Sequence, residues 1–141
     1  MRHFLVLHNE EKVGRAKHED FLASSSKSFE LDKTDRIWLI VGRGSVQKDY
    51  LLWKTFIYDN RIESNDSNDE HRFKYVGSYK GKMFCPPIRL NDLNWFTDFK
   101  QAMASFIGMR EITDDRYILE LSKFLSLDWI PTDLDHIVDT R

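Results

Sequence analysis

The chain has 141 residues, of which 41% are hydrophobic and 31% charged, and these values fit one globular domain with a core of ordinary size. Its single cysteine, Cys85, excludes an intramolecular disulfide and a cysteine-based zinc site within one chain, and it favours a reducing, cytoplasmic setting. Near the start, only positions 4–7 form an unbroken apolar run, which is too short for a signal-peptide core or a membrane span.

The net charge of −2 is unevenly distributed along the chain. Residues 36–89 contain ten basic and six acidic residues, whereas residues 111–141 contain three basic and eight acidic ones. A basic segment with interleaved aromatic residues suits a partner that carries phosphate groups. An ordinary solvated surface has the same composition, so the charge pattern alone leaves both interpretations open.

The first half of the chain predicts three strands. Residues 3–8, HFLVLH, form an apolar run typical of a buried strand, and a short helix is predicted around residues 17–23. Residues 35–41 and 48–62 predict two more strands, joined by a polar loop over residues 42–49. The strand over residues 48–62 is apolar on both faces, which is typical of a long strand that bends around a small barrel.

The second half predicts two strands and then two helices. After a polar hairpin loop over residues 63–71, one strand is predicted over residues 72–79 and another begins at Met83. Pro86 and Pro87 lack an amide donor, so they require this last strand to lie at an edge or to end there.

Helix-capping residues mark the starts of the two helices. Asn91 or Asp92 is predicted to cap the first, which carries an apolar stripe and ends at Gly108, and Thr113 is predicted to cap the second. Strands followed by helices favour the α+β class. We therefore predict one domain over residues 1–126 and an acidic, partly docked tail over residues 127–141.

This order of elements resembles the PUA-like superfamily, and within it the EVE-like and ASCH-like domains. The resemblance rests on the apolar first strand and on three segments: IWLIVGRG (37–44), YLLWKTFIYDNRI (50–62) and PPIRLNDLNWF (86–96). It is strongest to the EVE-like modules found beside HNH nucleases in modification-dependent restriction systems. The resemblance implies a small bent β-barrel of about five strands with two or three flanking helices.

The resemblance also implies a reader of nucleic acid that takes a flipped, modified base of DNA or RNA into an aromatic-lined pocket. The chain itself has no HNH pattern, so cleavage would require a nuclease domain or a partner chain. We expect a binding module without a catalytic set, a cofactor, a metal or a membrane partner. The cluster Asp66, Asp69, Glu70 and His71 lies in a polar loop and is not expected to hold a metal.

A flipped-base pocket requires flat rings for stacking and polar groups for the base edge. The candidate rings are Trp38, Trp53, Tyr75 and Trp95, each of which also suits a place in the core. The candidate polar residues are Gly42, Arg43, Gly44, Ser45, Lys48 and Lys54. The loop glycines allow a ligand to approach the backbone closely, and Arg43 and Lys48 supply charge-assisted hydrogen bonds.

Two alternatives to a reader stay open. An ASCH-like enzyme acting on RNA or on a small nucleoside-like amide would have a titratable group, such as Lys54, inside the cleft. A protein-interaction domain would use the acidic tail and an exposed apolar patch.

Overall fold

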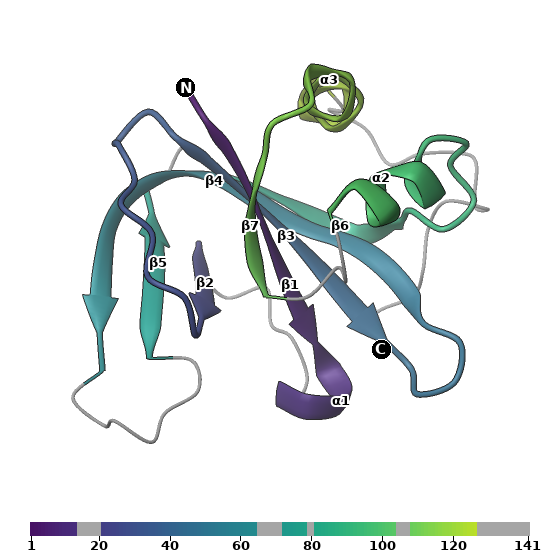
Figure 1. The fold of residues 1–141 in the computed structure, drawn as a ribbon, viewed down its shortest axis with the longest axis horizontal. Helices are drawn as coiled ribbons and strands as arrows, with labels where there is room; N and C mark the ends of the chain where they lie inside the picture. Colours follow the sequence, from purple (N-terminus) through teal and green to yellow (C-terminus); the bar gives the residue numbers. More distant parts are fainter. Residues whose placement is uncertain (14–20, 65–71, 79–80, 104–107, 127–141) are drawn as a thin grey trace.

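One long strand, β4 (Asp49–Glu63), organises the sheet. The computed structural model describes residues 1–13, 21–64, 72–78, 81–103 and 108–126, and Figure 1 shows their arrangement. Six other strands join the sheet: β1 (His3–Asn9), β2 (Leu22–Ser25), β3 (Arg36–Arg43), β5 (Phe73–Gly77), β6 (Lys82–Arg89) and β7 (Met109–Ile112). The helices are α1 (Glu10–Val13), α2 (Phe96–Ala102) and α3 (Asp115–Ser122), and the 3-10 turn η2 (Lys123–Ser126) follows α3.

The first half of β4 pairs with β3 on one side and with β6 on the other, and its second half pairs with β5. Register shifts in both halves accompany a strong bend, which turns β5 and its neighbour β2 out of the plane of the central strands and over one of their faces (Figure 1). The strand order β2-β5-β4-β3-β1-β7 ends in two edges, so the described strands do not close into a barrel. The α+β class is confirmed, as is the long bent strand.

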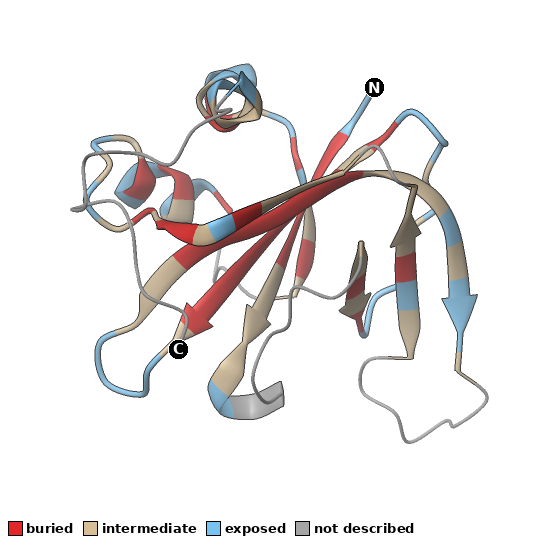
Figure 2. Cartoon of the chain, turned by 180° about the vertical axis from the view of Figure 1, so that it is seen from behind, coloured by how far each residue is buried: buried red, intermediate tan, exposed pale blue. Residues whose placement is uncertain are grey.

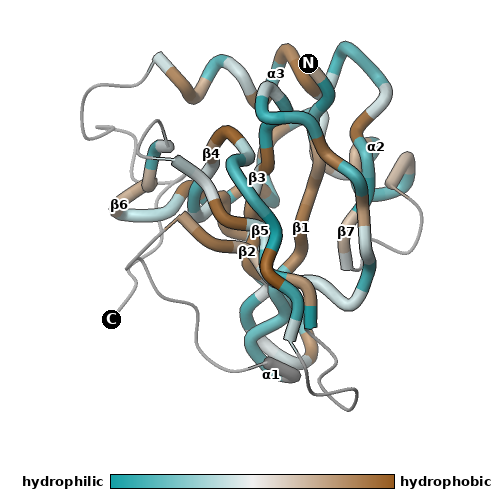
Figure 3. The backbone as a smooth tube through the Cα atoms, turned by 90° about the vertical axis from the view of Figure 1, so that its left-hand side faces the viewer, coloured by the Kyte–Doolittle hydropathy of each residue, from teal (hydrophilic) through white to brown (hydrophobic). Residues whose placement is uncertain are grey.

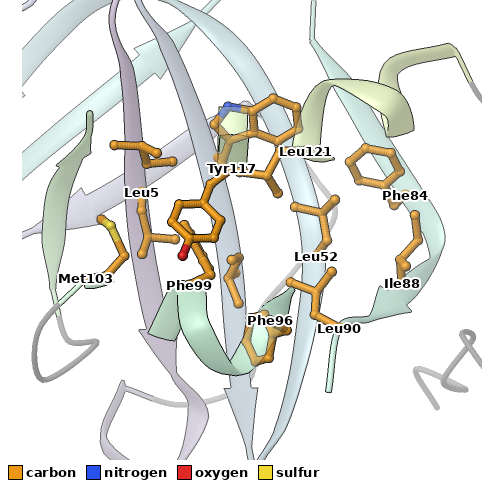
Figure 4. Close-up of a cluster of buried hydrophobic side chains, with 13 residues drawn as sticks. Leu5, Leu52, Phe84, Ile88, Leu90, Phe96, Phe99, Met103, Tyr117 and Leu121 are labelled. Atoms are coloured by element: carbon orange, nitrogen blue, oxygen red, sulfur yellow. The ribbon is translucent and has the colours of Figure 1, made fainter. Parts of the chain in front are cut away.

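The sheet has a core on each face because its central strands are apolar on both sides. The helical core lies beneath α2 and α3, where Phe99, Tyr117 and Leu121 face Leu5 and Leu52 of the sheet (Figure 4). Figure 2 shows that the central strands are buried along most of their length.

The strand core lies on the opposite face, beneath β2 and β5. It contains Phe4, Val6, Ala23, Ile37, Leu39, Val41, Leu51, Trp53, Phe56, Tyr75 and Met109. The hydropathy view in Figure 3 shows the apolar course of β1 and the mixed character of the outer segments.

Two short strands were not predicted. Residues 22–25 belong to β2 rather than to a helix or loop, and residues 17–20 of the predicted helix lie outside the described chain. The sequences LASS and MREI have little apolar character, so the pairing of β2 with β5 and of β7 with β1 gives them strand structure. The prediction that the prolines lie at an edge is confirmed, because among the described strands β6 pairs only with β4. The Cys85–Pro86 bond within β6 is cis.

Both helices begin later than predicted. Helix α2 begins at Phe96, because the Asn91 side chain is used elsewhere: it bonds to the β3–β4 hairpin. Helix α3 is capped by Asp114 rather than by Thr113, and the Asp114 carboxylate accepts a hydrogen bond from the Arg116 amide. In the part of the chain that the structure describes, no helix is both long and apolar enough to cross a membrane.

Candidate nucleic-acid interface

The carboxyl ends of β1 and β3 meet beside the predicted polar loop. The two strands are parallel, and their register aligns Asn9 with Gly42. Helix α1 begins immediately after β1, and its Glu10 carboxylate accepts a hydrogen bond of 2.6 Å from the Nε of Arg43. This bond and the Glu10 charge raise the pKa of Arg43. The guanidinium carbon also lies 5.5 Å from the Trp53 ring, so Arg43 is held between a carboxylate and an aromatic face.

The other face of the hairpin carries a half-buried tyrosine, Tyr50, near two lysines. Gly42 is paired with Tyr50, and a Cβ placed on Gly42 would lie 3.6 Å from the Tyr50 ring and 3.7 Å from the Lys48 side chain. On α2, the Nζ of Lys100 lies 4.7 Å from the centre of the same ring. Burial raises the pKa of Tyr50, so its phenol stays neutral near pH 7. We call Gly42, Arg43, Lys48, Tyr50 and Lys100 the hairpin rim.

Residues 44–48 form the exposed tip between the two faces. Gly44 has a φ of +106°, and a Cβ there would lie 2.7 Å from the Gln47 carbonyl oxygen, so this turn requires glycine. Ser45 is exposed, as is Val46, at 94%. The base of the tip is fixed by Asn91, whose side chain accepts from the Tyr50 amide (2.7 Å) and donates to the Lys48 carbonyl (2.9 Å).

The four candidate rings do not meet in one pocket. Trp38 is fully buried in the helical core, whereas Trp53 and Tyr75 are buried in the strand core on the other face. Trp95 is half-buried at the start of α2 and packs on the helical core. In this structure Trp38, Trp53 and Tyr75 offer no exposed face for stacking, because alternation along the strands turns each of them into a core.

Tyr75 has a structural role that the sequence did not reveal. Its hydroxyl donates to the Lys27 carbonyl (2.6 Å) and accepts from the Phe29 amide (2.8 Å). These bonds fasten the connection between β2 and β3 to β5.

Lys54 is also buried, with 3% of its surface exposed, and it lies opposite Leu39 in the β3–β4 pair. Its side chain is therefore not part of the outer surface of the rim. The ASCH-like alternative expects an inward-facing lysine with a carboxylate near it, and the burial of Lys54 meets the first of these two expectations.

Four of the five arginines of residues 36–89 are paired with carboxylates, including Arg43 with Glu10. Arg61 pairs with Glu30, Arg72 with Glu63, and Arg89 with both Asp49 and Asp92. A continuous basic track along the strands is therefore not formed by these arginines. The hairpin rim, which brings Lys48, Tyr50 and Lys100 together, is the better candidate surface.

Sequence reasoning missed three residues of this site: Glu10, Asn91 and Lys100. Asn91 resembled a helix cap, and Lys100 lies fifty positions from Tyr50 in the chain, so neither carried a local signal. Within the described ranges, no group of three or more His, Cys, Asp or Glu residues is arranged to hold a metal. The acidic loop cluster and the tail over residues 127–141 lie outside those ranges.

No protein-family model matches the sequence, and no curated protein is detectably similar to it. The interface is therefore argued from its own geometry.

Proposed function

We propose that the chain is a nucleic-acid-binding reader of the PUA-like, EVE-like kind, and that it binds DNA or RNA through the hairpin rim. The observation that carries the proposal is the position of Lys100, whose Nζ lies 4.7 Å from the centre of the Tyr50 ring, together with the Lys48 side chain close to Gly42, the glycine that is paired with Tyr50. An aromatic ring flanked by cations suits a base together with its adjacent phosphates.

The rim supplies the three kinds of contact that a reader needs. Lys48 and Lys100 attract phosphates, and the Tyr50 ring offers a stacking face for a base. The exposed tip contributes the Ser45 hydroxyl and backbone groups at Gly44, which suit the edge of an extruded base. Arg43, held on Trp53 by Glu10, offers its remaining donors on the other face of the hairpin.

The course of the sheet supports the PUA-like part of the proposal. The bend of β4 brings β2 over the central strands, where Ala23 of β2 and Phe4 of β1 share the strand core. This arrangement approaches a barrel while leaving its edges open. In this proposal the module supplies recognition in the cytoplasm, and a nuclease domain or a partner chain supplies any cleavage.

Binding is tested by fluorescence anisotropy with methylated, hydroxymethylated and plain DNA duplexes and with single-stranded RNA. We expect at least one of them to bind, with an affinity that falls steeply as salt rises, because phosphate contacts release counterions. The double variant Lys48→Gln/Lys100→Gln should weaken binding about tenfold and lower the salt slope by about 2, since each phosphate contact contributes about 0.9.

The matched control is Lys33→Gln/Lys123→Gln, which removes the same charge from exposed lysines that pair with Asp59 and Glu120. It should change the affinity less than about twofold. Absence of binding to every oligonucleotide at low salt, or equal losses in the two double variants, would contradict the proposal. Tyr50→Leu should cost about 1–3 kcal/mol of binding if the ring stacks on a base.

The burial of Lys54 favours a second candidate, an ASCH-like enzyme acting on RNA or on a nucleoside-like amide. Lysine serves as a general base in catalysis. In this case Lys54→Met abolishes turnover of such amides while the rim variants raise only KM. Unchanged turnover in Lys54→Met would exclude this role for Lys54.

A further inference from the structure

A row of polar side chains crosses the sheet at the opposite end of β3 from the hairpin rim. It consists of His3 on β1, Arg36 on β3, Thr55 on β4 and Lys82 on β6. The strand registers make these residues neighbours, since His3 aligns with Arg36 and Thr55 with Lys82. We call these four residues the cation row. The length of β3 separates it from the rim by about 23 Å, at roughly 3.3 Å per residue.

Arg36 is the central residue of the row. It is half-buried, its Nη1 donates to the Thr55 hydroxyl (3.1 Å), and its guanidinium carbon lies 5.8 Å from the Trp38 ring. The Thr55 hydroxyl donates in turn to the Ile37 carbonyl (2.8 Å). Because the hydroxyl proton is used in this bond, a lone pair of the Thr55 oxygen accepts the bond from Arg36. Burial lowers the pKa of Arg36. A guanidinium has five N–H donors, so this one bond uses a small part of its capacity.

Arg36 differs from most other arginines of the chain. Six of the eight described arginines pair with carboxylates, namely Arg2, Arg43, Arg61, Arg72, Arg89 and Arg116. Within the described residues, only Arg36 and Arg110 make no such pair. Arg110 lines a cavity of about 220 Å³ together with Glu111 and Asp114. The negative charges of these two carboxylates would repel an anionic ligand at Arg110. Among the residues that the structure describes, no carboxylate forms an ion pair with Arg36.

His3 adds a donor of known direction. It is 8% exposed, and its Nδ1 accepts a 3.0 Å hydrogen bond from the Trp38 indole. A neutral imidazole that accepts at Nδ1 carries its proton on Nε2. No hydrogen bond from Nε2 is formed with the described residues, so this donor is available beside Arg36.

Lys82 completes the positive charge of the row. Its Nζ donates to the Leu125 carbonyl of η2 (3.3 Å) and lies 5.8 Å from the Phe84 ring. The nearby Asp35 carboxylate is already bound by Arg2, at 3.0 Å. The cation row thus places Arg36 and Lys82 beside apolar rings, where charge-assisted bonds are strengthened by the low dielectric.

We propose that the cation row binds a phosphoryl group, with Arg36 and the Nε2 of His3 as hydrogen-bond donors and Lys82 as a charge. The planar guanidinium matches the oxygens of a phosphate. The phosphoryl group belongs either to a terminal phosphomonoester or to a backbone phosphodiester, because both present the same oxygens. This site stands independently of the function proposed for the hairpin rim.

NMR titration of the full chain at constant ionic strength tests the proposal. Methyl phosphate, dimethyl phosphate and inorganic phosphate are added up to about 50 mM, while the Trp38 indole N–H and the His3 ring signals are followed. We expect a saturable shift of both signals with at least one of the esters. Saturation by methyl phosphate alone assigns a terminal phosphate, and saturation by dimethyl phosphate assigns a backbone phosphate.

Arg36→Gln should weaken this binding about tenfold or more, and Lys82→Gln, which removes a charge but no planar pair of donors, should weaken it about threefold. Lys48→Gln in the hairpin rim is the matched control and should leave it unchanged. Shifts that grow linearly with every anion, or an equal affinity in both row variants and the wild type, would overturn the proposal. Because Lys48→Gln weakens only rim binding, failure of one site is distinguishable from failure of the other.

Discussion

Asp35 is a buried carboxylate that fixes the entry into β3. It is 1% exposed and accepts hydrogen bonds from the Arg2 amide, the Asp32 amide and the Arg2 guanidinium, at 2.8, 2.8 and 3.0 Å. Burial by itself raises the pKa of Asp35, but these hydrogen bonds and the Arg2 charge outweigh it and lower the pKa. The charged form of the Asp35 carboxylate is therefore stabilised by its hydrogen-bond donors.

Asp35→Asn should lower the free energy of unfolding by about 2–3 kcal/mol, because charge-assisted bonds become neutral and the new amide NH2 faces donors. Urea denaturation at neutral pH measures the change. The control is Asp59→Asn, which alters a half-exposed carboxylate 3.8 Å from Lys33. It should stay within about 0.5 kcal/mol, and a comparable loss in both variants would contradict this role of Asp35.

His3 makes stability depend on pH. Burial, then the Arg36 charge, then the N-terminal amine lower its pKa below the usual value. As the pH falls through about 6.5, His3 therefore becomes protonated in the unfolded chain while it is still neutral in the folded chain. The His3 contribution is complete above that pH and is lost as the pH falls toward the lowered folded pKa.

The free energy of unfolding should therefore fall by up to about 1.4 kcal/mol per pH unit as the pH drops below about 6.5. His3→Gln keeps an acceptor for the Trp38 indole and should flatten this dependence between about pH 7.5 and 5. The Asp35 contribution is lost only near pH 4 and below, so the two windows are separate. Identical pH profiles for wild type and variant would rule out the His3 effect.

At the scale of elements, β5 lies against the bend of β4 at a distance that only glycine permits. A Cβ on Gly77 would lie 2.3 Å from the Phe56 ring, which is completely buried and has no room to move. The close approach lets Tyr58 pair with Gly77 and starts the β4–β5 ladder. A glycine inside a predicted strand was thus a sign of close packing.

Gly77→Ala should cost about 2 kcal/mol or more, since overpacking displaces the Phe56 ring. Gly42→Ala is the matched control, because its Cβ would lie 3.6 Å from the nearest atom and should cost less than about 1 kcal/mol. Thermal unfolding of both variants measures the difference. A Gly77→Ala protein as stable as Gly42→Ala would show that the two strands are not packed this closely.

Helix α3 covers the helical core with one face only. Leu121 is fully buried beneath it, whereas Leu119, two positions earlier, is 62% exposed. Leu121→Ala should cost about 3 kcal/mol through lost burial and a cavity, and Leu119→Ala less than about 0.5 kcal/mol. Denaturant titration of the two variants measures both losses in the free energy of unfolding and so reports which face of α3 is buried. A larger loss for Leu119→Ala than for Leu121→Ala would mean that the opposite face is buried.

At the scale of the whole molecule, the two cores share their central strands. On β1, Phe4 belongs to the strand core and Leu5 to the helical core, and the same alternation runs through β3 and β4. Neither core can lose its packing without releasing strands that the other requires. We expect the domain to unfold as one cooperative unit.

The tryptophans report each core separately, because Trp38 lies in the helical core and Trp53 in the strand core. Their indole NMR signals should disappear at the same urea concentration, within about 0.2 M. Loss of one signal well before the other would show that the two faces unfold independently.

Much of the fold follows from the sequence, but the assembly of the site does not. The long apolar strand β4 and the α+β order were predicted because hydrophobic periodicity acts over neighbouring residues. The prediction of Arg43 and Lys48 at the exposed end of the β3–β4 pair also rested on a local pattern. Tyr50 and Lys100 meet only because α2 packs against the sheet, which no local pattern specifies.

The sequence by itself determined which segments are apolar on both faces, where the chain turns, and that the polar loop is rich in glycine. The tertiary structure alone decided that Trp38 and Trp53 belong to opposite cores, that β2 and β7 are strands, and that Arg36 stands without a carboxylate among the described residues. The physical reason is that propensity and periodicity are properties of neighbours in the chain. Burial, charge pairing and strand pairing depend instead on residues that become neighbours only in space.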